Sequence, residues 1–94
     1  MKFTFKQLLA TPGANEAFNR NQQSLHEFLE RHLSGDWGDL CAEDKQLNEQ
    51  ALVDGSRLMS AYRLKDATRV WCITEAIGDD GQREATTFLL PDEY

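Results

Sequence analysis

The stretch that decides the fold is Ser24-Leu25-His26-Glu27-Phe28-Leu29-Glu30-Arg31-His32-Leu33-Ser34-Gly35. Ser24 and Glu27 have the spacing of a capping box, in which two side chains satisfy backbone N–H groups at the start of a helix. The residues behind them recur at the spacing of one helical face, namely Leu25, Phe28, Leu29, His32 and Leu33. Gly35 ends the pattern, because glycine readily adopts the left-handed conformation that satisfies the last carbonyls of a helix. The stretch therefore predicts an amphipathic helix.

Two further helices are predicted on either side of this one. Thr11 and Pro12 combine a capping side chain with a proline at the first helical position, which favours a short helix that runs to about Phe18. Residues 42–53 are rich in helix-forming side chains, carry two acids at the positive end of the helix dipole, and stop before Gly55. The N-terminal half is thus mainly helical.

The C-terminal half changes to the period of β-strands. Residues 56–64 alternate between two faces, as in a half-buried strand, and one face carries Leu58, Ser60, Tyr62 and Leu64. Residues 68–76 are dense in β-branched and aromatic side chains on both faces, which is typical of a central strand. Residues 85–90 form a third strand that Pro91 closes. Short connections join the three strands, and strands joined in this way pair antiparallel.

These elements predict an α+β fold in which two to three N-terminal helices pack on a C-terminal three-stranded antiparallel β-meander. The chain has 94 residues, which is the size of a single domain spanning 1–94. Residues 3–10 stay ambiguous, because Phe3 and Phe5 alternate as in a strand whereas Leu8, Leu9 and Ala10 would suit a short helix. The three helices, or two of them, must cover the apolar face of the meander.

Composition excludes several functional classes. The net charge is −6 and the sequence pI is about 4.7, so the chain repels nucleic-acid phosphates and direct nucleic-acid binding is not expected. No apolar run is long enough for a secretion signal or a membrane span, which indicates a cytoplasmic protein that does not enter membranes. Cys41 and Cys72 do not form a Cys-x-x-Cys motif and are expected to be free thiols.

The negative charge is concentrated in two tracts. Residues 35–54 hold six acids against Lys45, and residues 75–94 hold six acids against Arg83, so each tract carries a net charge of −5. An acidic surface of this kind can occupy a basic groove that otherwise holds DNA or RNA, and its long-range field steers association. The first tract therefore supplies the candidate partner-binding residues Asp36, Trp37, Asp39, Glu43, Asp44 and Glu49.

Trp37 has two interpretations within this candidate site. A tryptophan in a glycine-flanked turn can fold back as a lid over the base of the preceding helix, which is the interpretation we favour. If it is exposed instead, its large apolar surface makes it the hot spot of an interface. The two interpretations differ in one observable, the exposed fraction of the indole.

The sequence offers little catalytic or metal-binding chemistry. His26 and His32 are six residues apart, about 240° around a helix, and do not share a face for a zinc ion. His32 lies on the apolar stripe, where a histidine usually bonds to a backbone carbonyl. Asp36 and Asp39 lack the alternating ligand positions of a calcium loop. We expect no catalytic residue, no metal and no cofactor, and hence a protein that is not an enzyme.

Several segments resemble a family of short bacterial proteins carried on plasmids, integrative elements and prophages, which are described as plasmid-related or as a type I restriction subunit. The resemblance covers about residues 32–94, with a weaker echo over residues 10–14. It rests on residues 32–39, on Asn48, Leu52, Gly55, Arg57 and residues 60–62, on Trp71 and residues 73–76, and on Thr86, Thr87, Leu89, Leu90, Pro91, Glu93 and Tyr94. The family carries no established catalytic residues, and Cys41, Cys72 and residues 78–81 lie outside its pattern.

The resemblance implies an accessory protein of a mobile element or phage, possible examples being anti-CRISPR and anti-restriction inhibitors of host defence. We expect a small, acidic, non-enzymatic protein-interaction protein whose acidic surface binds a basic nucleic-acid-binding surface of a host defence complex, with Tyr94 as a second candidate anchor. An alternative is a small ligand-binding or enzymatic domain with a pocket between helix and sheet near His32, Asp36 and Arg57. A third is a homodimer formed through an exposed edge strand at residues 85–90.

Overall fold

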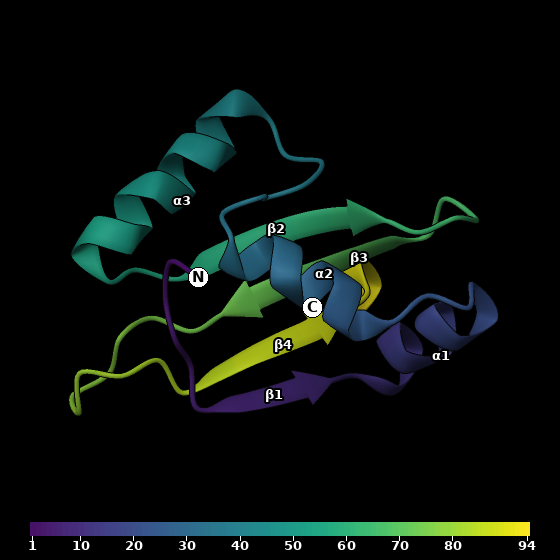
Figure 1. Cartoon of the computed structure of the whole chain (residues 1–94), viewed down its shortest axis with the longest axis horizontal. Coiled ribbons are helices and arrows are strands. Elements are labelled where there is room, and N and C mark those ends of the chain that lie inside the picture. The colour runs from purple at the N-terminus through teal and green to yellow at the C-terminus, as the bar shows by residue number, and fades with distance from the viewer.

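The structure is a computed structural model that describes all residues from 1 to 94. It shows an α+β protein in which one four-stranded sheet carries two helices on one face and a third helix at one edge (Figure 1). The strands lie in the order β1-β4-β3-β2. The elements are β1 (Gln7–Ala10), α1 (Pro12–Arg20), α2 (Leu25–Leu33), α3 (Ala42–Asp54), β2 (Leu58–Arg63), β3 (Arg69–Thr74), β4 (Ala85–Leu89) and the 3-10 helix η1 (Pro91–Glu93).

The sheet corrects the predicted three-stranded meander. β2, β3 and β4 do pair antiparallel in chain order, as their short connections favour. A fourth strand, β1, pairs parallel with β4, so the sheet is mixed and the expectation of an exposed edge strand at residues 85–90 is wrong. The helices are also not all N-terminal, because β1 precedes them and η1 follows the last strand. The ambiguity of residues 3–10 resolves to a strand at Gln7–Ala10, whose partner lies more than seventy residues along the chain.

Local signals place the helix ends where the sequence predicts them. Thr11 and Ser24 have extended backbones, and their hydroxyls accept N–H bonds from the first turns of α1 and α2. Gly35 and Gly55 both adopt the left-handed conformation after a helix, with φ of 86° and 82°. α3 begins at Ala42 without a side-chain cap but with two acids in its first turn, which favour the positive end of the helix dipole.

The main core lies between α1, α2 and one face of the sheet. Its centre is a row of four aromatic side chains, in the order Phe88, Phe18, Phe28 and Tyr62. The centroids of neighbouring rings in this row lie 5.4 to 5.7 Å apart. Each of these four side chains is buried. Leu58, Ser60, Tyr62 and Leu64 are all at most 4% exposed, which confirms the buried face predicted from their alternation; Tyr62 and Leu64 belong to the main core and Leu58 to a smaller cluster beside it.

The opposite face of the sheet carries no α-helix. The chain end crosses it instead, and the ring of Tyr94 lies 5.7 Å from that of Trp71 on β3. The guanidinium of Arg57 donates a 2.6 Å hydrogen bond to the Tyr94 hydroxyl. The carboxylate of Glu93 accepts bonds from Thr11 and from the backbone N–H of Leu90, so the end of the chain is tied to the sheet and to the start of α1.

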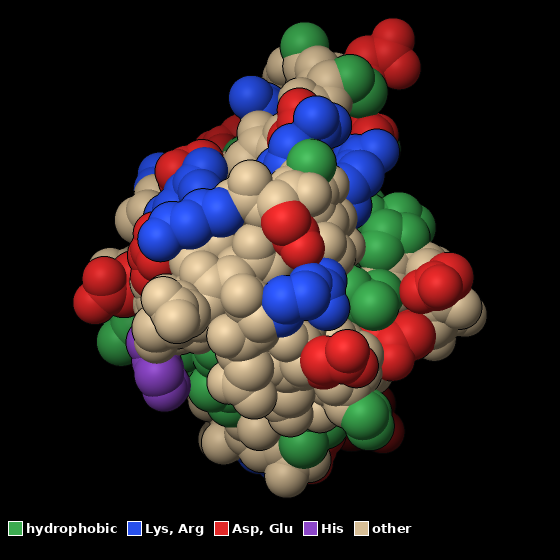
Figure 2. All heavy atoms as spheres, turned by 90° about the vertical axis from the view of Figure 1, so that its right-hand side faces the viewer, with side chains coloured by type: hydrophobic (Ala, Val, Ile, Leu, Met, Phe, Trp, Pro, Cys, Tyr) green, Lys and Arg blue, Asp and Glu red, His purple; other side chains and the backbone are tan.

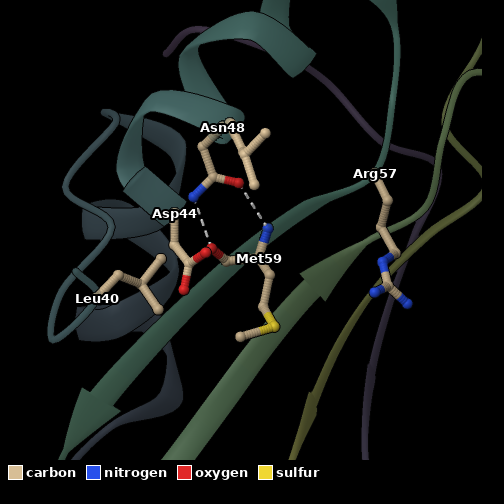
Figure 3. A pocket seen from close by; sticks show the side chains of 6 residues that line it. Leu40, Asp44, Asn48, Arg57 and Met59 are labelled. Carbon is tan, nitrogen blue, oxygen red and sulfur yellow. Dashed lines mark hydrogen bonds between the residues drawn. The ribbon is translucent and has the colours of Figure 1, made fainter. Parts of the chain in front are cut away.

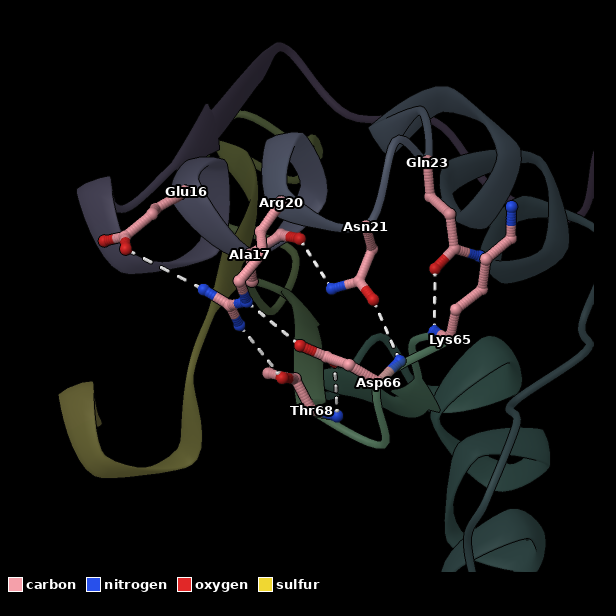
Figure 4. A network of polar contacts seen from close by, with 8 residues as sticks. All are labelled: Glu16, Ala17, Arg20, Asn21, Gln23, Lys65, Asp66 and Thr68. Carbon is pink, nitrogen blue, oxygen red and sulfur yellow. Dashed lines mark hydrogen bonds and ion pairs between the residues drawn. The ribbon is translucent and has the colours of Figure 1, made fainter.

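A network of polar contacts fixes the β2–β3 turn to the end of α1 (Figure 4). The Asn21 side chain accepts a bond from the backbone N–H of Asp66 and donates one to the carbonyl of Ala17. The carboxylate of Asp66 accepts bonds from Thr68 and from Arg20. These donors hold the pKa of Asp66 well below its ordinary value. The polar residues between α1 and α2 therefore hold the β2–β3 turn in place.

Candidate functional site

The acidic turn between α2 and α3 is tied back to α2 by its first carboxylate. Asp36 forms an ion pair with Arg31, at 2.7 Å, and also accepts the backbone N–H of Gly38. The hydrogen bond from Arg31 is the largest influence that lowers the pKa of Asp36. The guanidinium of Arg31 in turn lies over the ring of Tyr62, 4.7 Å from its centroid. The charge of Asp36 is thus neutralised within the molecule.

The same turn closes the outer edge of β2. The backbone of Ala61 donates to the carbonyl of Trp37 at 3.1 Å and accepts from the N–H of Asp39. Gly38 makes this approach possible, since a Cβ at that position would lie 2.0 Å from the Ala61 carbonyl oxygen, and its φ is 76°. Gly35 and Gly38 therefore allow the backbone conformation of the turn.

Trp37 is a core residue. It is only 4% exposed and packs in a small cluster with Ala51 and Leu58. Its indole N–H donates a 2.8 Å hydrogen bond to the carboxylate of Glu49 on α3. The interpretation of a buried indole is confirmed: its ring also lies 5.7 Å from that of His32 at the end of α2, and it is not part of the exposed surface.

The second aspartate of the turn is also paired. Asp39 lies 3.1 Å from the guanidinium of Arg63 at the end of β2, with both side chains more than half exposed. Glu49 is exposed, but its carboxylate is engaged by the indole of Trp37. Three of the six predicted site residues, Asp36, Trp37 and Asp39, are therefore elements of the fold that lock the turn onto α2, α3 and β2.

The remaining acids lie on α3, and this helix takes part in none of the ion pairs of the molecule. Glu43, Leu47 and Asp54 follow one another at i, i+4 and i+11, which places them along one side of the helix. Leu47 is 66% exposed. We call the exposed side chains of Glu43, Asp44, Leu47 and Asp54 the α3 surface.

The side chain of Asn48 holds α3 against β2, because it forms the two hydrogen bonds that a neighbouring strand would form. The amide of Asn48 donates to the carbonyl of Met59 at 2.7 Å and accepts from the N–H of the same residue at 3.0 Å. Together with the turn at Ala61, this pairing satisfies the outward-facing backbone groups of Met59 and Ala61. The α3 surface is therefore presented by a helix fixed through its opposite side.

A hollow of about 220 Å³ lies between α3 and β2 beside this surface. Its walls are Leu40, Asp44, Leu47, Asn48, Arg57 and Met59. In Figure 3 the carboxylate of Asp44 lies near Leu40 and Met59, whereas the guanidinium of Arg57 is turned away at the far end. The volume is below the range of about 300–1,000 Å³ that is usual for small-molecule sites, so the hollow suits one side chain of a partner.

The residues of the alternative site do not converge. His32 is fully buried on the helix side of the sheet, Asp36 is bound to Arg31, and Arg57 contacts Tyr94 on the other side. His32 bonds to the hydroxyls of Ser60 and Thr74, so the expectation of a backbone carbonyl partner is wrong. No pocket forms around these three residues.

His32 starts a chain of buried hydroxyls that crosses the sheet. Its Nε2 lies 2.9 Å from the Thr74 hydroxyl, which lies 2.7 Å from that of Thr86. Burial, with a smaller contribution from the charge of Arg83, lowers the pKa of His32 to about 4. The imidazole is therefore neutral at physiological pH, and without solvent access it holds α2 to the sheet.

Both cysteines are free, Cys41 exposed before α3 and Cys72 buried in β3, where burial raises the pKa of the thiol. No group of three or more His, Cys, Asp or Glu side chains is placed to hold a metal ion. None of the helices has the length and apolar character needed to cross a bilayer.

Sequence reasoning missed two residues that matter for the fold around the site. Asn48 had no periodic signal, because a side chain that imitates a strand is defined only by its distant partner. Arg83 stood alone in an acidic tract, yet it is 4% exposed and donates to the carbonyls of Ser56, Glu75 and Ala51. It therefore joins the second acidic tract to the end of α3.

Basic side chains also cluster on one part of the surface, although the net charge of the chain is negative. Figure 2 shows the end of the molecule with the β2–β3 turn, where Lys and Arg side chains cluster with acids between them. Arg63 and Arg69 are directly paired across β2 and β3 at this end. The surface is thus not uniformly acidic, and the unpaired acids of α3 stand apart from this mixed region.

Comparison with known proteins adds no assignment: no protein-family model, curated protein or solved structure matches the chain.

Proposed function

We propose that this is a small, non-enzymatic interaction protein that binds a basic surface of a partner protein through the α3 surface. The observation that carries the proposal is the contrast between the acids of the turn, which are neutralised by Arg31 and Arg63, and those of α3, which take part in no ion pair. Unpaired carboxylates around an exposed leucine combine long-range attraction with an apolar contact.

The charged groups and the apolar groups of the α3 surface have different roles. Glu43, Asp44 and Asp54 are exposed and supply the field that steers a basic partner. Leu47 and the adjacent hollow supply a place where one apolar side chain of the partner can be buried. Compared with the surface expected from the sequence, the proposal drops Asp36, Trp37 and Asp39 as contact residues and moves the contact along α3.

The resemblance to short proteins of plasmids, integrative elements and prophages suggests where the partner is found. A nucleic-acid-binding groove of a host defence complex, such as a CRISPR or restriction complex, is basic and is lined for phosphates. An anionic helix can occupy such a groove and exclude the nucleic acid. We therefore propose an inhibitor of host defence as the biological role.

The proposal is tested by capture from bacterial lysate at low and high salt, with Glu43→Lys/Asp44→Lys as the test variant. The matched control is Glu75→Lys/Asp79→Lys, which makes the same change of charge at two exposed acids that form no ion pair. The wild type and the control should capture the same protein at low salt and lose it at high salt. The α3 variant should not capture it under either condition.

A second pair of variants separates the apolar contact from the charge. Leu47→Ala should weaken capture at low salt, where the charges of α3 are intact, whereas Val53→Ala, which truncates an even more exposed residue of the same helix, should not. Equal capture by wild type and Glu43→Lys/Asp44→Lys would refute the proposal. So would equal losses in the test variant and the Glu75→Lys/Asp79→Lys control, because they would show that only total charge matters.

A further inference from the structure

The two edges of the sheet differ, because β2 has covered backbone groups and β1 does not. The outer edge of β2 is closed, because Asn48 bonds both backbone groups of Met59 and the turn bonds both backbone groups of Ala61. The outer edge of β1 has no such cover, and in Figure 1 the strand forms the free border of the sheet. An uncovered edge is a template for a further strand.

The free backbone groups of β1 can be identified from its register. Gln7 donates to the carbonyl of Glu84 and Thr11 donates to that of Phe88, so alternate residues of the strand turn toward β4. Leu8 and Ala10 are the intervening residues, and their N–H and C=O groups point outward. They therefore offer two donors and two acceptors to a partner.

The devices that usually guard such an edge are missing here. Gln7–Ala10 contains no charge and no proline, and its backbone pairs with β4 without a bulge. Lys6, just before the strand, is occupied by Asp80 and Glu84. Leu9 faces the side of the sheet without helices and is 44% exposed. Within the strand itself, only its shortness limits pairing.

We propose that β1 pairs antiparallel with β1 of a second copy of this chain, which joins two four-stranded sheets into one of eight strands. A two-fold axis at Leu9 sets Leu8 opposite Ala10 of the other copy, so that the outward groups of both residues exchange four hydrogen bonds. The two Leu9 side chains then meet as the closely spaced pair of the ladder. The strand is self-complementary in both its hydrogen bonds and its apolar contact.

Self-pairing suits this strand better than pairing with a charged segment. The strand has no charge of its own to select a basic or acidic partner, and its one exposed leucine is matched by its own copy. A strand of four residues gives a small contact, and small interfaces are typical of weak complexes, so we expect a weak dimer. Each chain carries a net charge of −6, and added salt screens this repulsion and strengthens the dimer.

The test is sedimentation equilibrium of the full chain from micromolar to millimolar concentration at low and high salt. The wild type should shift from monomer to dimer with concentration, and more readily at high salt. Leu9→Lys places two like charges opposite each other and should weaken the dimer roughly tenfold. Val53→Lys is the matched control, since it changes an exposed apolar residue that lies outside the α3 surface, and it should dimerise as the wild type does.

A readout on the wild type alone guards against a variant that fails to fold. The amide resonances of Leu8 and Ala10 should shift and gain protection from exchange as concentration rises, whereas those of Met59 and Ala61 should be protected at all concentrations. A monomer at every concentration would overturn the proposal, as would a dimer that Leu9→Lys leaves intact. The salt response separates this test from that of α3, because binding of α3 to a basic partner weakens with salt.

Discussion

Replacement of His32 should remove most of the pH dependence of stability between pH 7 and 4.5. The imidazole is 0% exposed, is bonded to Ser60 and Thr74, and faces the positive charge of Arg83. A proton on the ring would therefore enter a site that is shielded from water and already positive. The variant His32→Gln keeps hydrogen-bonding groups at this position but has no proton to gain, so it isolates the titration.

The magnitude follows from the two pKa values. Burial lowers the pKa of His32 from 6.5 to about 4, so the unfolded chain takes up a proton at a higher pH than the folded protein. Stability must then fall as the pH drops below 6.5 and level off below about 4. Each pKa unit corresponds to about 1.4 kcal/mol, so the whole window is worth about 3 kcal/mol, of which about 2 kcal/mol is lost between pH 7 and 4.5.

The free energy of unfolding is measured in urea at a series of pH values, with the fluorescence of Trp37 and Trp71 as the signal. Between pH 7 and 4.5 the carboxylates contribute little, because groups such as Asp36 have a lowered pKa and their stabilisation is lost only below about pH 4. His26 is exposed, so His26→Gln is the matched control and should retain the wild-type loss.

Two results would refute this reasoning. If the wild type kept the same free energy of unfolding from pH 7 to 4.5, the ring of His32 would be reached by protons in the folded state. If His32→Gln showed the same loss as the wild type, the pH dependence would belong to other groups.

Three further substitutions test the devices that hold α3 and β2. Gly38→Ala should destabilise the protein by about 2 kcal/mol or more in urea unfolding, because the new Cβ would collide with the carbonyl of Ala61 in a left-handed backbone, and unchanged stability would contradict the close approach. Asn48→Ala leaves the N–H and C=O of Met59 without partners and should cost about 1–3 kcal/mol, with faster hydrogen exchange at Met59 as the local sign; an unaltered exchange rate would show that α3 does not need this bond. Arg83→Met removes one donor from three backbone carbonyls, of which that of Ala51 keeps the N–H of Gly55, and should cost about 3 kcal/mol; a melting temperature equal to that of the wild type would disprove the role of this buried cation.

Much of the fold follows from local patterns in the sequence. The caps at Thr11 and Ser24 and the left-handed Gly35 are short-range signals, and the structure confirms them. The alternation from Leu58 to Leu64 also assigns the buried face of β2 correctly. β1 was not predictable in the same way, because what makes Gln7–Ala10 a strand is the free edge of β4.

The candidate site shows why the net charge of a sequence segment does not predict the charge of the surface that it forms. Residues 35–54 add up to −5, but Arg31 and Arg63, which neutralise Asp36 and Asp39, lie outside that tract. Pairing between distant segments cannot be found by counting along the chain. Trp37 illustrates the same limit, since its burial depends on the position of α3.

Competition between this protein and nucleic acid tests the central claim most directly. The protein captured by the wild type is purified, loaded with labelled nucleic acid, and titrated with wild type, Glu43→Lys/Asp44→Lys or the Glu75→Lys/Asp79→Lys control. We predict that the wild type and the control release the nucleic acid and that the α3 variant does not. Release by all three proteins, or by none of them, would contradict the claim that α3 occupies a nucleic-acid groove.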